Sequence, residues 1–455
     1  MDLRLLSKKI LLDESSSDSD YAPELPPKEK KRRSDGYSRE KKLDVAPEGL
    51  WGRDIPPEVL LCIFRRALAS QGAIPLLFRL SRVCTLWRSV ARTEILWRRI
   101  ILTGNLNLKT SIQCQFACDR LRHARSLTLS NCRNLSAKAF ETISDSCRQL
   151  DELTVSKSGL LSRGLSVLEI VLNNSSLTHL SLLSLPSGSI GSLKEALEKR
   201  ALNLRFLNLR GSEFTCALSL LVSAIAASCS YLRHLDLSET GRAGFFPIHE
   251  LQLKCPNLEV LSLDDLLFLE PFPISNYVKS CPGFPCLNVL TLAKARFMTP
   301  SRTWFLEAIL GESGDLKALD IRYWQVSLVD FISVAGTTLR RLYCGSWPKS
   351  VNVQSFLAVL STYTELVELD LSHCFGVNDE VVMSLADFSL ASTLEVLDLS
   401  STVVTQVGVE RILNRCNCLR SLNLTGCRGA PRGWKRDHDP ESLQELRSAI
   451  NKTLE

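Results

Sequence analysis

The stretch Leu366-Val-Glu-Leu-Asp-Leu-Ser-His-Cys374 and its near copy Leu419-Arg-Ser-Leu-Asn-Leu-Thr-Gly-Cys427 carry the pattern that decides the fold. Their common core, Leu-x-x-Leu-x-Leu, recurs from about residue 120 onward, at intervals of 23 to 29 residues. The second leucine of this core, termed the middle leucine, stands at twelve positions: Leu127, Leu153, Leu180, Leu207, Leu235, Leu261, Leu290, Leu319, Leu342, Leu369, Leu397 and Leu422.

A period of this length is typical of leucine-rich repeats. Leucines at i and i+2 of a short strand point to one side, and their neighbours point to the other. Apolar residues at helical spacing in 217–227 and 407–414 predict helices that cover the inner side of the strands. One unit is too small to bury its apolar face alone. We therefore expect an α/β fold, in which about twelve stacked repeats form a curved solenoid with a parallel sheet on its concave side.

Many of the 16 cysteines follow the same register. Some stand five residues after a middle leucine, and others stand three residues before the first leucine of a repeat. Such positions favour small buried core residues over chemistry. A zinc site is disfavoured because the chain contains no Cys-x-x-Cys pair, and we expect neither a metal nor another cofactor. The cysteines in register are Cys132, Cys374 and Cys427, and Cys147, Cys229, Cys255 and Cys416.

Composition and charge describe a folded chain with one basic segment. The 455 residues are 45% hydrophobic and 23% charged, which excludes wholesale disorder. Residues 1–50 hold 11 Lys/Arg and 11 Asp/Glu, residues 51–100 hold 9 and 3, and the remainder holds 35 and 35. The net charge of +6 therefore belongs to residues 51–100. A basic segment of this kind suits an acidic partner.

No run of about 18 apolar residues occurs, and the longest, near Leu218 to Cys229, is short and broken by serine, so a membrane span is not predicted. Charged residues interrupt the leucines at the N-terminus, so a signal peptide is not predicted either. We expect the chain in the cytoplasm or the nucleus, with its cysteines reduced. Residues 1–46 hold too few apolar residues to offset chain entropy, so we predict a disordered tail. Its basic run, Lys28 to Arg33, is open to two interpretations, a nuclear import signal or a solvated run of charge.

Residues 51–100 do not fit the repeat and predict three short helices. Pro56, Pro57 and Glu58 suit the first turn of a helix. An apolar stripe then follows at helical spacing from Val59 to Ala67. About fifty residues are marginal for a self-sufficient core, so part of this apolar surface is expected to dock against something else.

This segment resembles the F-box, through Ile55-Pro-Pro-Glu-Val-Leu-Leu-Cys-Ile-Phe64, Val83-Cys-Thr-Leu-Trp87-Arg and Leu96-Trp97. The repeats, over about residues 120–430, resemble the cysteine-containing leucine-rich repeats of F-box proteins. The resemblance implies a helical F-box in residues 47–105 that binds the Skp adaptor, and through it cullin and the RING subunit. It also implies that the solenoid, residues 106–430, captures an unknown protein substrate for ubiquitination and proteasomal degradation.

Roles at the adaptor surface are implied one position at a time by the same resemblance. Ile55, Pro56 and Leu60 are the preferred contacts, whereas internal packing is an equal alternative for Phe64, Val83 and Trp97. The stretch from Arg65 to Arg82 is longer than is usual in the family, which leaves its contacts open. The complete predicted adaptor-binding set is Ile55, Pro56, Glu58, Leu60, Ile63, Phe64, Val83, Cys84, Trp87, Leu96 and Trp97.

Outward strand positions next to the middle leucines predict where a substrate binds. Aromatic residues and arginine carry a disproportionate share of interface energy, so Phe206, Arg341 and Tyr343 are preferred. The segment Gly345 to Pro348 is predicted to be irregular and exposed. Asp439 and Pro440 begin a predicted final helix, within a capping segment at 431–455. The predicted substrate-binding set is His179, Phe206, Arg210, His234, Arg322, Arg341 and Tyr343.

The alternatives differ in class. An enzyme is disfavoured because the six histidines are scattered and no Gly-rich phosphate loop or metal-binding His pair occurs, so no catalytic residues are predicted. The serious alternative is a non-catalytic repeat scaffold that binds proteins without a role in a ligase. Nucleic acid is a weaker alternative, supported only by the local charge of residues 51–100.

Overall fold

The computed structural model describes residues 55–71, 73–74, 76–103, 120–132, 137–156, 167–186, 189–199, 203–214, 218–269, 273–297, 303–311, 316–324, 337–347 and 352–454. The predicted tail of residues 1–46, its basic run and Pro348 lie outside these described residues. Everything that follows concerns the unit from Trp51 to Glu455.

Within the described residues, one sheet joins fourteen strands in the order β1 to β6, β8, β10 and β12 to β17. All neighbours are parallel except β16 and β17, which are antiparallel. The strands are β1 (Arg99–Thr103), β2 (Ser126–Ser130), β3 (Glu152–Ser156), β4 (His179–Leu182), β5 (Phe206–Asn208), β6 (His234–Asp236), β8 (Val260–Ser262), β10 (Val289–Thr291), β12 (Ala318–Asp320), β13 (Arg341–Tyr343), β14 (Glu368–Asp370), β15 (Val396–Asp398), β16 (Ser421–Asn423) and β17 (Asp437–His438).

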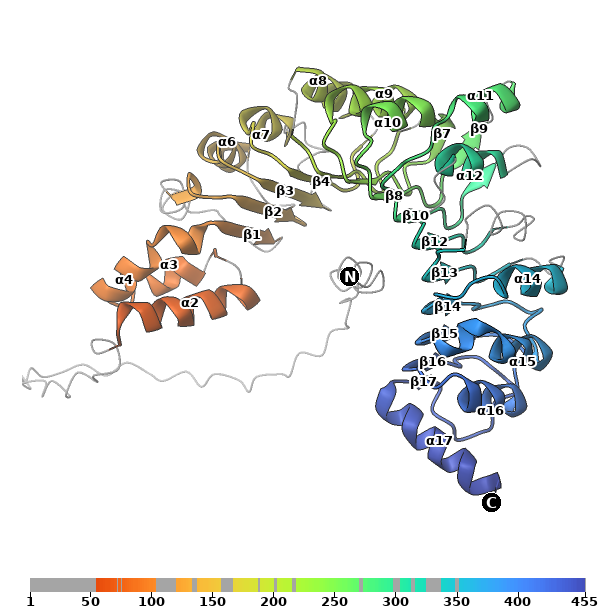
Figure 1. Cartoon of the computed structure of the whole chain (residues 1–455). Coiled ribbons are helices and arrows are strands. Elements are labelled where there is room, and N and C mark those ends of the chain that lie inside the picture. Colours follow the sequence, from red (N-terminus) through yellow and green to blue (C-terminus); the bar gives the residue numbers. More distant parts are fainter. Residues whose placement is uncertain are drawn as a thin grey trace, which may run out of the picture. The chain divides into compact units, whose positions relative to one another are not determined.

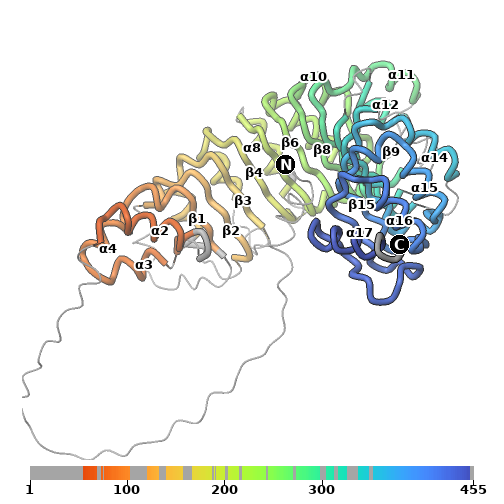
Figure 2. The backbone as a smooth tube through the Cα atoms, turned by 60° about the horizontal axis from the view of Figure 1, so that its bottom comes forward, coloured from red at the N-terminus to blue at the C-terminus, as the bar shows by residue number. Residues whose placement is uncertain are grey.

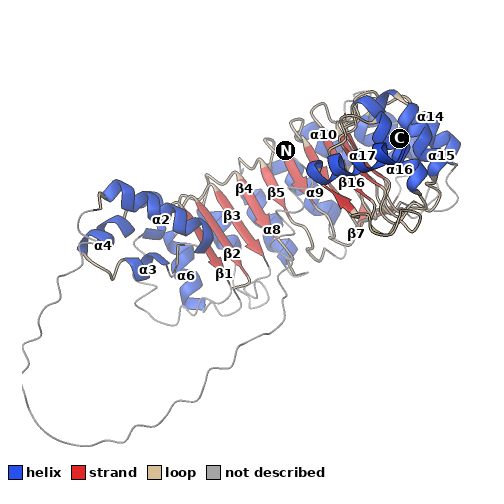
Figure 3. Ribbon diagram, turned by 90° about the horizontal axis from the view of Figure 1, so that it is seen from below, coloured by secondary structure: helices blue, strands red, loops and turns tan. Residues whose placement is uncertain are grey.

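Helices connect successive strands and form a second layer on one face of the sheet, as the red strands and blue helices of Figure 3 show. The opposite face of the sheet is termed the outer face. The helices are α2 (Pro57–Gln71), α3 (Leu76–Leu80), α4 (Thr85–Ala91), η1 (Glu94–Trp97), α6 (Ala137–Ser146), α7 (Val167–Asn173), α8 (Ile190–Lys199), α9 (Leu218–Ser228), α10 (Ile248–Lys254), α11 (Ile274–Ser280), α12 (Thr303–Leu310), α14 (Val353–Leu360), α15 (Asp379–Asp387), η4 (Ser389–Ser392), α16 (Gln406–Arg415) and α17 (Pro440–Leu454).

The predicted repeat register is confirmed at every middle leucine. Each one is paired with the middle leucine of the next repeat, from Leu127 with Leu153 to Leu397 with Leu422. Ile100 in β1, the strand before the first repeat, occupies the position of a middle leucine and pairs with Leu127. The sheet therefore continues from the repeats into the segment that follows the N-terminal helices (Figure 1).

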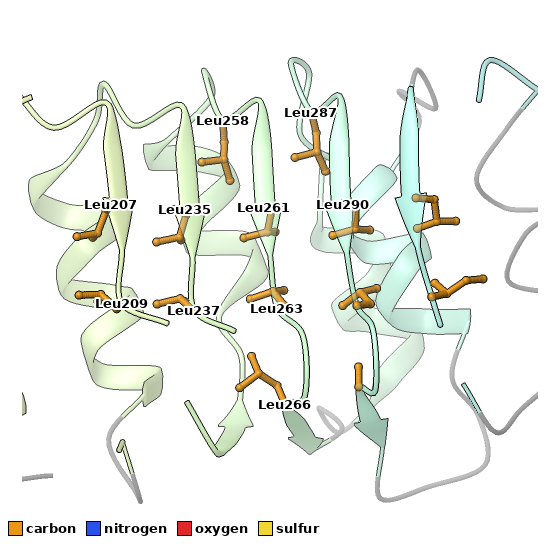
Figure 4. Close-up of a cluster of buried hydrophobic side chains, with 14 of the residues drawn as sticks. Leu207, Leu209, Leu235, Leu237, Leu258, Leu261, Leu263, Leu266, Leu287 and Leu290 are labelled. Carbon is orange, nitrogen blue, oxygen red and sulfur yellow. The ribbon is translucent and has the colours of Figure 1, made fainter. Parts of the chain in front are cut away.

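The core lies between the sheet and its helices. All middle leucines are at most 1% exposed. Figure 4 shows that Leu207, Leu235 and Leu261 point to the same side of the sheet as Leu209, two residues after the first of them. Successive turns of the backbone repeat this arrangement, which Figure 2 follows as a tube. The predicted helices at 217–227 and 407–414 are confirmed as α9 and α16.

The end of each repeat strand has one conformation, which the pattern Leu-Asp-Leu-Ser stabilises. The carboxylate of Asp370 accepts a hydrogen bond from the backbone N–H of Ser372 at 2.8 Å, and Asp398 accepts one from Ser400 at 2.9 Å. The residue four positions after the middle leucine then has a positive φ, which is 76° at Gly426. A Cβ atom there would lie 2.7 Å from Ser401 Oγ, so a larger residue at Gly426 would require this serine side chain to move. These aspartates thus cap their own turns.

Two features were not predicted. A second, three-stranded parallel sheet consists of β7 (Arg242–Phe245), β9 (Leu267–Leu269) and β11 (Arg296–Phe297). Its Phe268 ring packs 4.4 Å from Phe305 in α12, measured between ring centroids. The other feature is β17, whose His438 pairs with Leu422 and closes the last strand edge of the main sheet.

The predicted final helix is confirmed as α17. The carboxylate of Asp439 accepts a hydrogen bond from the N–H of Ser442 at 2.9 Å, and this contact lowers the pKa of the carboxyl group. Farther along the helix, Arg447 donates to the carbonyl oxygen of Cys416 at 2.6 Å and ties the helix to the end of α16. The cysteines in register are all buried, as predicted.

Candidate functional site

The N-terminal helical module, residues 55–98, has a packed interior built on one face of α2. Leu60 and Phe64 lie on this face and are 0% and 1% exposed. The Phe64 ring meets Trp87 edge to face, with ring centroids 5.3 Å apart. Trp97 is fully buried and its indole N–H donates to the carbonyl oxygen of Ala91 at 2.9 Å.

Four positions of the predicted adaptor set pack inside the module, which is the alternative already given for Phe64 and Trp97. Leu60, Phe64, Leu96 and Trp97 are at most 2% exposed, so in this conformation they stabilise the module and do not reach a partner. The preference for Leu60 as a contact is therefore wrong. Leu60 and Ile63 are three positions apart in one apolar stripe, but only one of them faces the interior, because the stripe is wider than the face that the other helices cover.

The remaining predicted residues lie at or near the surface. Ile63 is 49% exposed and Val83 is 59% exposed, while Pro56 and Glu58 are also exposed. Ile55, Cys84 and Trp87 are half-buried. The sulfur of Cys84 accepts a hydrogen bond from the backbone N–H of Trp87 at 3.4 Å, which caps α4. Cys84 therefore has a structural role.

Two exposed apolar residues of the module are absent from the predicted adaptor-binding set. Val59 is 49% exposed and Ile95 is 37% exposed. Val59 lies one helical turn before Ile63, so the i, i+4 spacing could have identified it. Val59, Ile63, Val83 and Ile95 together are termed the apolar surface residues of the module.

Positive charge accompanies these apolar residues. The only acidic residues among the described residues of the module are Glu58 and Glu94, both exposed. The exposed arginines of the module and of the first residues of the sheet are Arg65, Arg66, Arg79, Arg82, Arg88, Arg92, Arg98 and Arg99. A partner of the module would therefore meet apolar side chains within a basic field.

On the outer face of the sheet, the register brings three predicted residues together. His179, Phe206 and His234 are neighbours on β4, β5 and β6. The Phe206 ring lies 5.8 Å from that of His179 and 4.4 Å from that of His234, and both pairs are stacked at 22°. These residues are termed the aromatic stack. Burial, and to a lesser extent His179, lowers the pKa of His234 to about 4, so this imidazole is neutral at pH 7.

Farther along the outer face, Arg322 belongs to a network within the chain. Its guanidinium donates to the Asp320 carboxylate at 2.6 Å and lies 3.9 Å from the Asp370 carboxylate. It also lies over the ring of Tyr343, 5.7 Å from the centroid. The hydroxyl of Tyr343 donates to Glu368.

This network revises two predicted substrate contacts. Tyr343 is only 6% exposed, because Arg322 covers its ring and its hydroxyl is already hydrogen-bonded. Arg322 remains half-buried but is paired with its own chain. Arg210 is paired as well, at 2.6 Å from Glu239. Arg341 lies half-buried on β13.

The segment that begins at Gly345 is also not the exposed feature that was predicted. Trp347 is 5% exposed, and its ring packs edge to face on Phe356 with centroids 4.5 Å apart. In the described part of the chain, no group of three or more His, Cys, Asp or Glu residues is arranged to hold a metal ion. None of the described helices is long and apolar enough to cross a membrane.

A family model described as F-box-like matches residues 53–103. Among solved structures, an internalin (inlF) from Listeria monocytogenes str. 4b F2365 is similar at 17% identity and a TM-score of 0.39, over 68% of this chain and 89% of that chain. No curated protein matches the sequence. The chain thus combines an F-box-like domain with a leucine-rich-repeat solenoid. Modules of both kinds generally serve protein interaction without catalysis, and F-box domains generally bind Skp-type adaptors.

Proposed function

We propose that the chain is the substrate-recognition subunit of an SCF-type ubiquitin ligase, which consists of Skp adaptor, cullin, RING subunit and F-box protein. The observation that carries the proposal is the position of the apolar surface residues. They lie in solvent on the segment that matches the F-box-like model. Several exposed large apolar residues on so small a module are typical of a protein that a partner covers.

The solenoid offers a second binding surface, separate from that of the N-terminal module. The outer face of the solenoid offers rings, carboxylates and arginines, which are the groups that give selective protein binding. The module would bind the adaptor while the outer face binds a protein substrate. The substrate would then be ubiquitinated and degraded by the proteasome, in the cytoplasm or the nucleus. The alternative remains a scaffold that binds proteins through the same outer face without a ligase.

Within the F-box/LRR family, the chain resembles F-box/LRR-repeat protein six of vertebrates. The similar stretches are Trp51-Gly-Arg-Asp-Ile-Pro56, the long connection after Phe64, and Ala430-Pro-Arg-Gly-Trp-Lys-Arg436. We propose this relationship as a hypothesis on these residues alone.

Adaptor binding by one exposed residue tests the function. The variant Ile63→Asp places a charge among the apolar surface residues without touching the interior. We expect it to abolish binding of a recombinant Skp adaptor to the full-length chain in isothermal titration calorimetry. The matched control is Leu220→Asp, because Leu220 is 58% exposed on α9, outside the module. If the unmodified chain does not bind the adaptor, or both variants bind equally well, the scaffold alternative is favoured.

A further inference from the structure

The charges of the outer face are not balanced, although the solenoid as a whole is nearly neutral. From β6 to β15, the outward positions carry only two cations, Arg322 and Arg341. Arg322 is shared between two of the carboxylates. The carboxylates at outward positions in the same interval are Asp236, Asp264, Asp320, Glu368, Asp370 and Asp398.

Asp264 shows the effect of this imbalance. Burial and then the charge of Asp320 raise the pKa of the Asp264 carboxyl group to about 7. Asp236 contributes in the same direction. Arg210 and Arg322 lie two repeats from Asp264 on either side, and the first is held by Glu239 and the second by Asp320. The face therefore retains a site where an added positive charge is favourable.

The chain already contains an example of the interaction that such a surface supports. Arg322 places its guanidinium over the ring of Tyr343 while it donates hydrogen bonds to the Asp320 carboxylate. The aromatic stack presents rings of the same kind two repeats before Asp264, next to Asp236 in β6. The His234 side chain adds no repelling charge, because its imidazole is neutral at pH 7. Rings beside carboxylates form a surface that a guanidinium or ammonium group can enter.

We propose that the outer face between β4 and β12 binds a protein segment that carries arginine or lysine side chains, and not a phosphorylated or acidic one. The proposal rests on the proposed function, since it names the class of substrate segment for the same face. A segment rich in phosphate would meet six carboxylates, and the arginines that could receive it, Arg210 and Arg322, are held in ion pairs. The arginines of a basic segment would stack on the aromatic stack and pair with Asp264, which is half-buried.

Matched peptides test the charge that the face selects. The probe is a fluorescent peptide of repeated Gly-Ser-Arg units, and its binding to the full-length chain is measured by anisotropy. In the matched peptides, arginine is replaced by lysine, by citrulline, which has nearly the same shape without charge, by glutamate, or by phosphoserine. We expect the arginine and lysine peptides to bind, the citrulline peptide to bind about tenfold more weakly, and the two anionic peptides not to bind.

Variants test whether the binding is at this place. Phe206→Ala should weaken the arginine peptide about fivefold, because a ring is lost. Asp264→Asn keeps the oxygen that accepts a hydrogen bond from the Ala293 N–H. This variant should weaken binding of the arginine peptide to a similar degree, because the carboxylate charge is lost. The control for the ring is Tyr231→Ala, since Tyr231 is 59% exposed between α9 and β6. The control for the charge is Asp145→Asn, on the exposed surface of α6. Both controls should bind within twofold of the unmodified chain.

The outcomes separate this proposal from the proposed function. Equal or tighter binding of the phosphoserine or glutamate peptide overturns the basic-segment proposal, as does unchanged binding by both Phe206→Ala and Asp264→Asn. Ile63→Asp should bind the arginine peptide normally while it loses the Skp adaptor. If the unmodified chain binds the peptide at this place but no adaptor, the ligase function fails and the basic-segment surface stands.

Discussion

The N-terminal module and the outer face of the sheet use opposite means to offer a binding surface. The module leaves apolar side chains such as Ile63 and Val83 in solvent and also exposes many arginines. The outer face keeps its leucines inside, pairs Arg210 and Arg322 within the chain, and retains excess carboxylate. Apolar docking suits one constant partner, whereas a polar and aromatic surface selects among partners by charge and geometry. The difference agrees with the proposed function, in which the module binds one constant adaptor and the outer face binds a selected substrate.

The largest change in the free energy of unfolding is expected for a residue of α2. It should occur on the buried face of this helix and not on the exposed face. Leu60→Ala should lower the free energy of unfolding by about 2 to 5 kcal/mol, because it leaves a cavity in the module. Ile63→Ser should change it by no more than about 0.5 kcal/mol, since the side chain is already in solvent. Urea unfolding followed by tryptophan fluorescence measures both. Equal losses in the two variants would mean that Ile63 is part of the interior.

The raised pKa of Asp264 on the outer face predicts how the stability of the chain depends on pH. Its folded pKa of about 7 lies above the ordinary aspartate value of 3.8, so the folded state binds the proton more tightly than the unfolded state. The resulting stabilisation is complete below pH 3.8 and is lost as the pH rises to 7. Asp264→Asn should therefore be more stable than the unmodified chain by about 2 kcal/mol at pH 8, and no more stable below pH 4. Thermal unfolding across this pH range measures the difference; a constant difference would contradict the raised pKa.

His234 should show the opposite dependence. Its folded pKa of about 4 lies below the ordinary histidine value of 6.5, so the unfolded state takes up the proton first as the pH falls. The unmodified chain should lose about 1 kcal/mol of stability from this group between pH 6.5 and pH 4. His234→Gln should lose correspondingly less in the same thermal unfolding series, with His179→Gln as a control on the exposed end of the stack. Parallel curves for His234→Gln and the unmodified chain would exclude a buried neutral imidazole.

The smallest effect concerns the rate at which the adaptor associates. The arginines around the module lie in solvent, and salt screens such charges over distances of about 10 Å at 0.1 M. Raising sodium chloride from about 50 to about 300 mM should slow association a few-fold, with little change in dissociation. Stopped-flow fluorescence measures both rates. In the double variant Arg66→Gln/Arg92→Gln, the association rate should depend less on salt. An unchanged salt dependence would show that these arginines do not speed adaptor binding.

The candidate surfaces could be predicted only in part. The aromatic stack was predicted residue by residue, because three outward positions in register must become neighbours on parallel strands. Tyr343 was predicted by the same rule but is buried, because its cover comes from Arg322 and Glu368 on the two neighbouring repeats. A count of charges along residues 101–455 is neutral, and it could not show that carboxylates gather on the outer face. Substrate binding is therefore expected to depend on salt as well.

By itself, the sequence determined the repeat, its register and the helix that follows it. A leucine that recurs at one period pairs with the next copy of itself, and Asp439 caps α17 through a residue three positions away. Both are contacts between near neighbours or equal positions, so a pattern encodes them. Only the tertiary structure decided that Leu60 is inside while Val59 and Ile63 are outside, that Trp347 is covered, and that His438 closes the sheet. Those outcomes depend on which segments, distant in sequence, pack against each face, and the spacing of residues along the chain does not predict this packing.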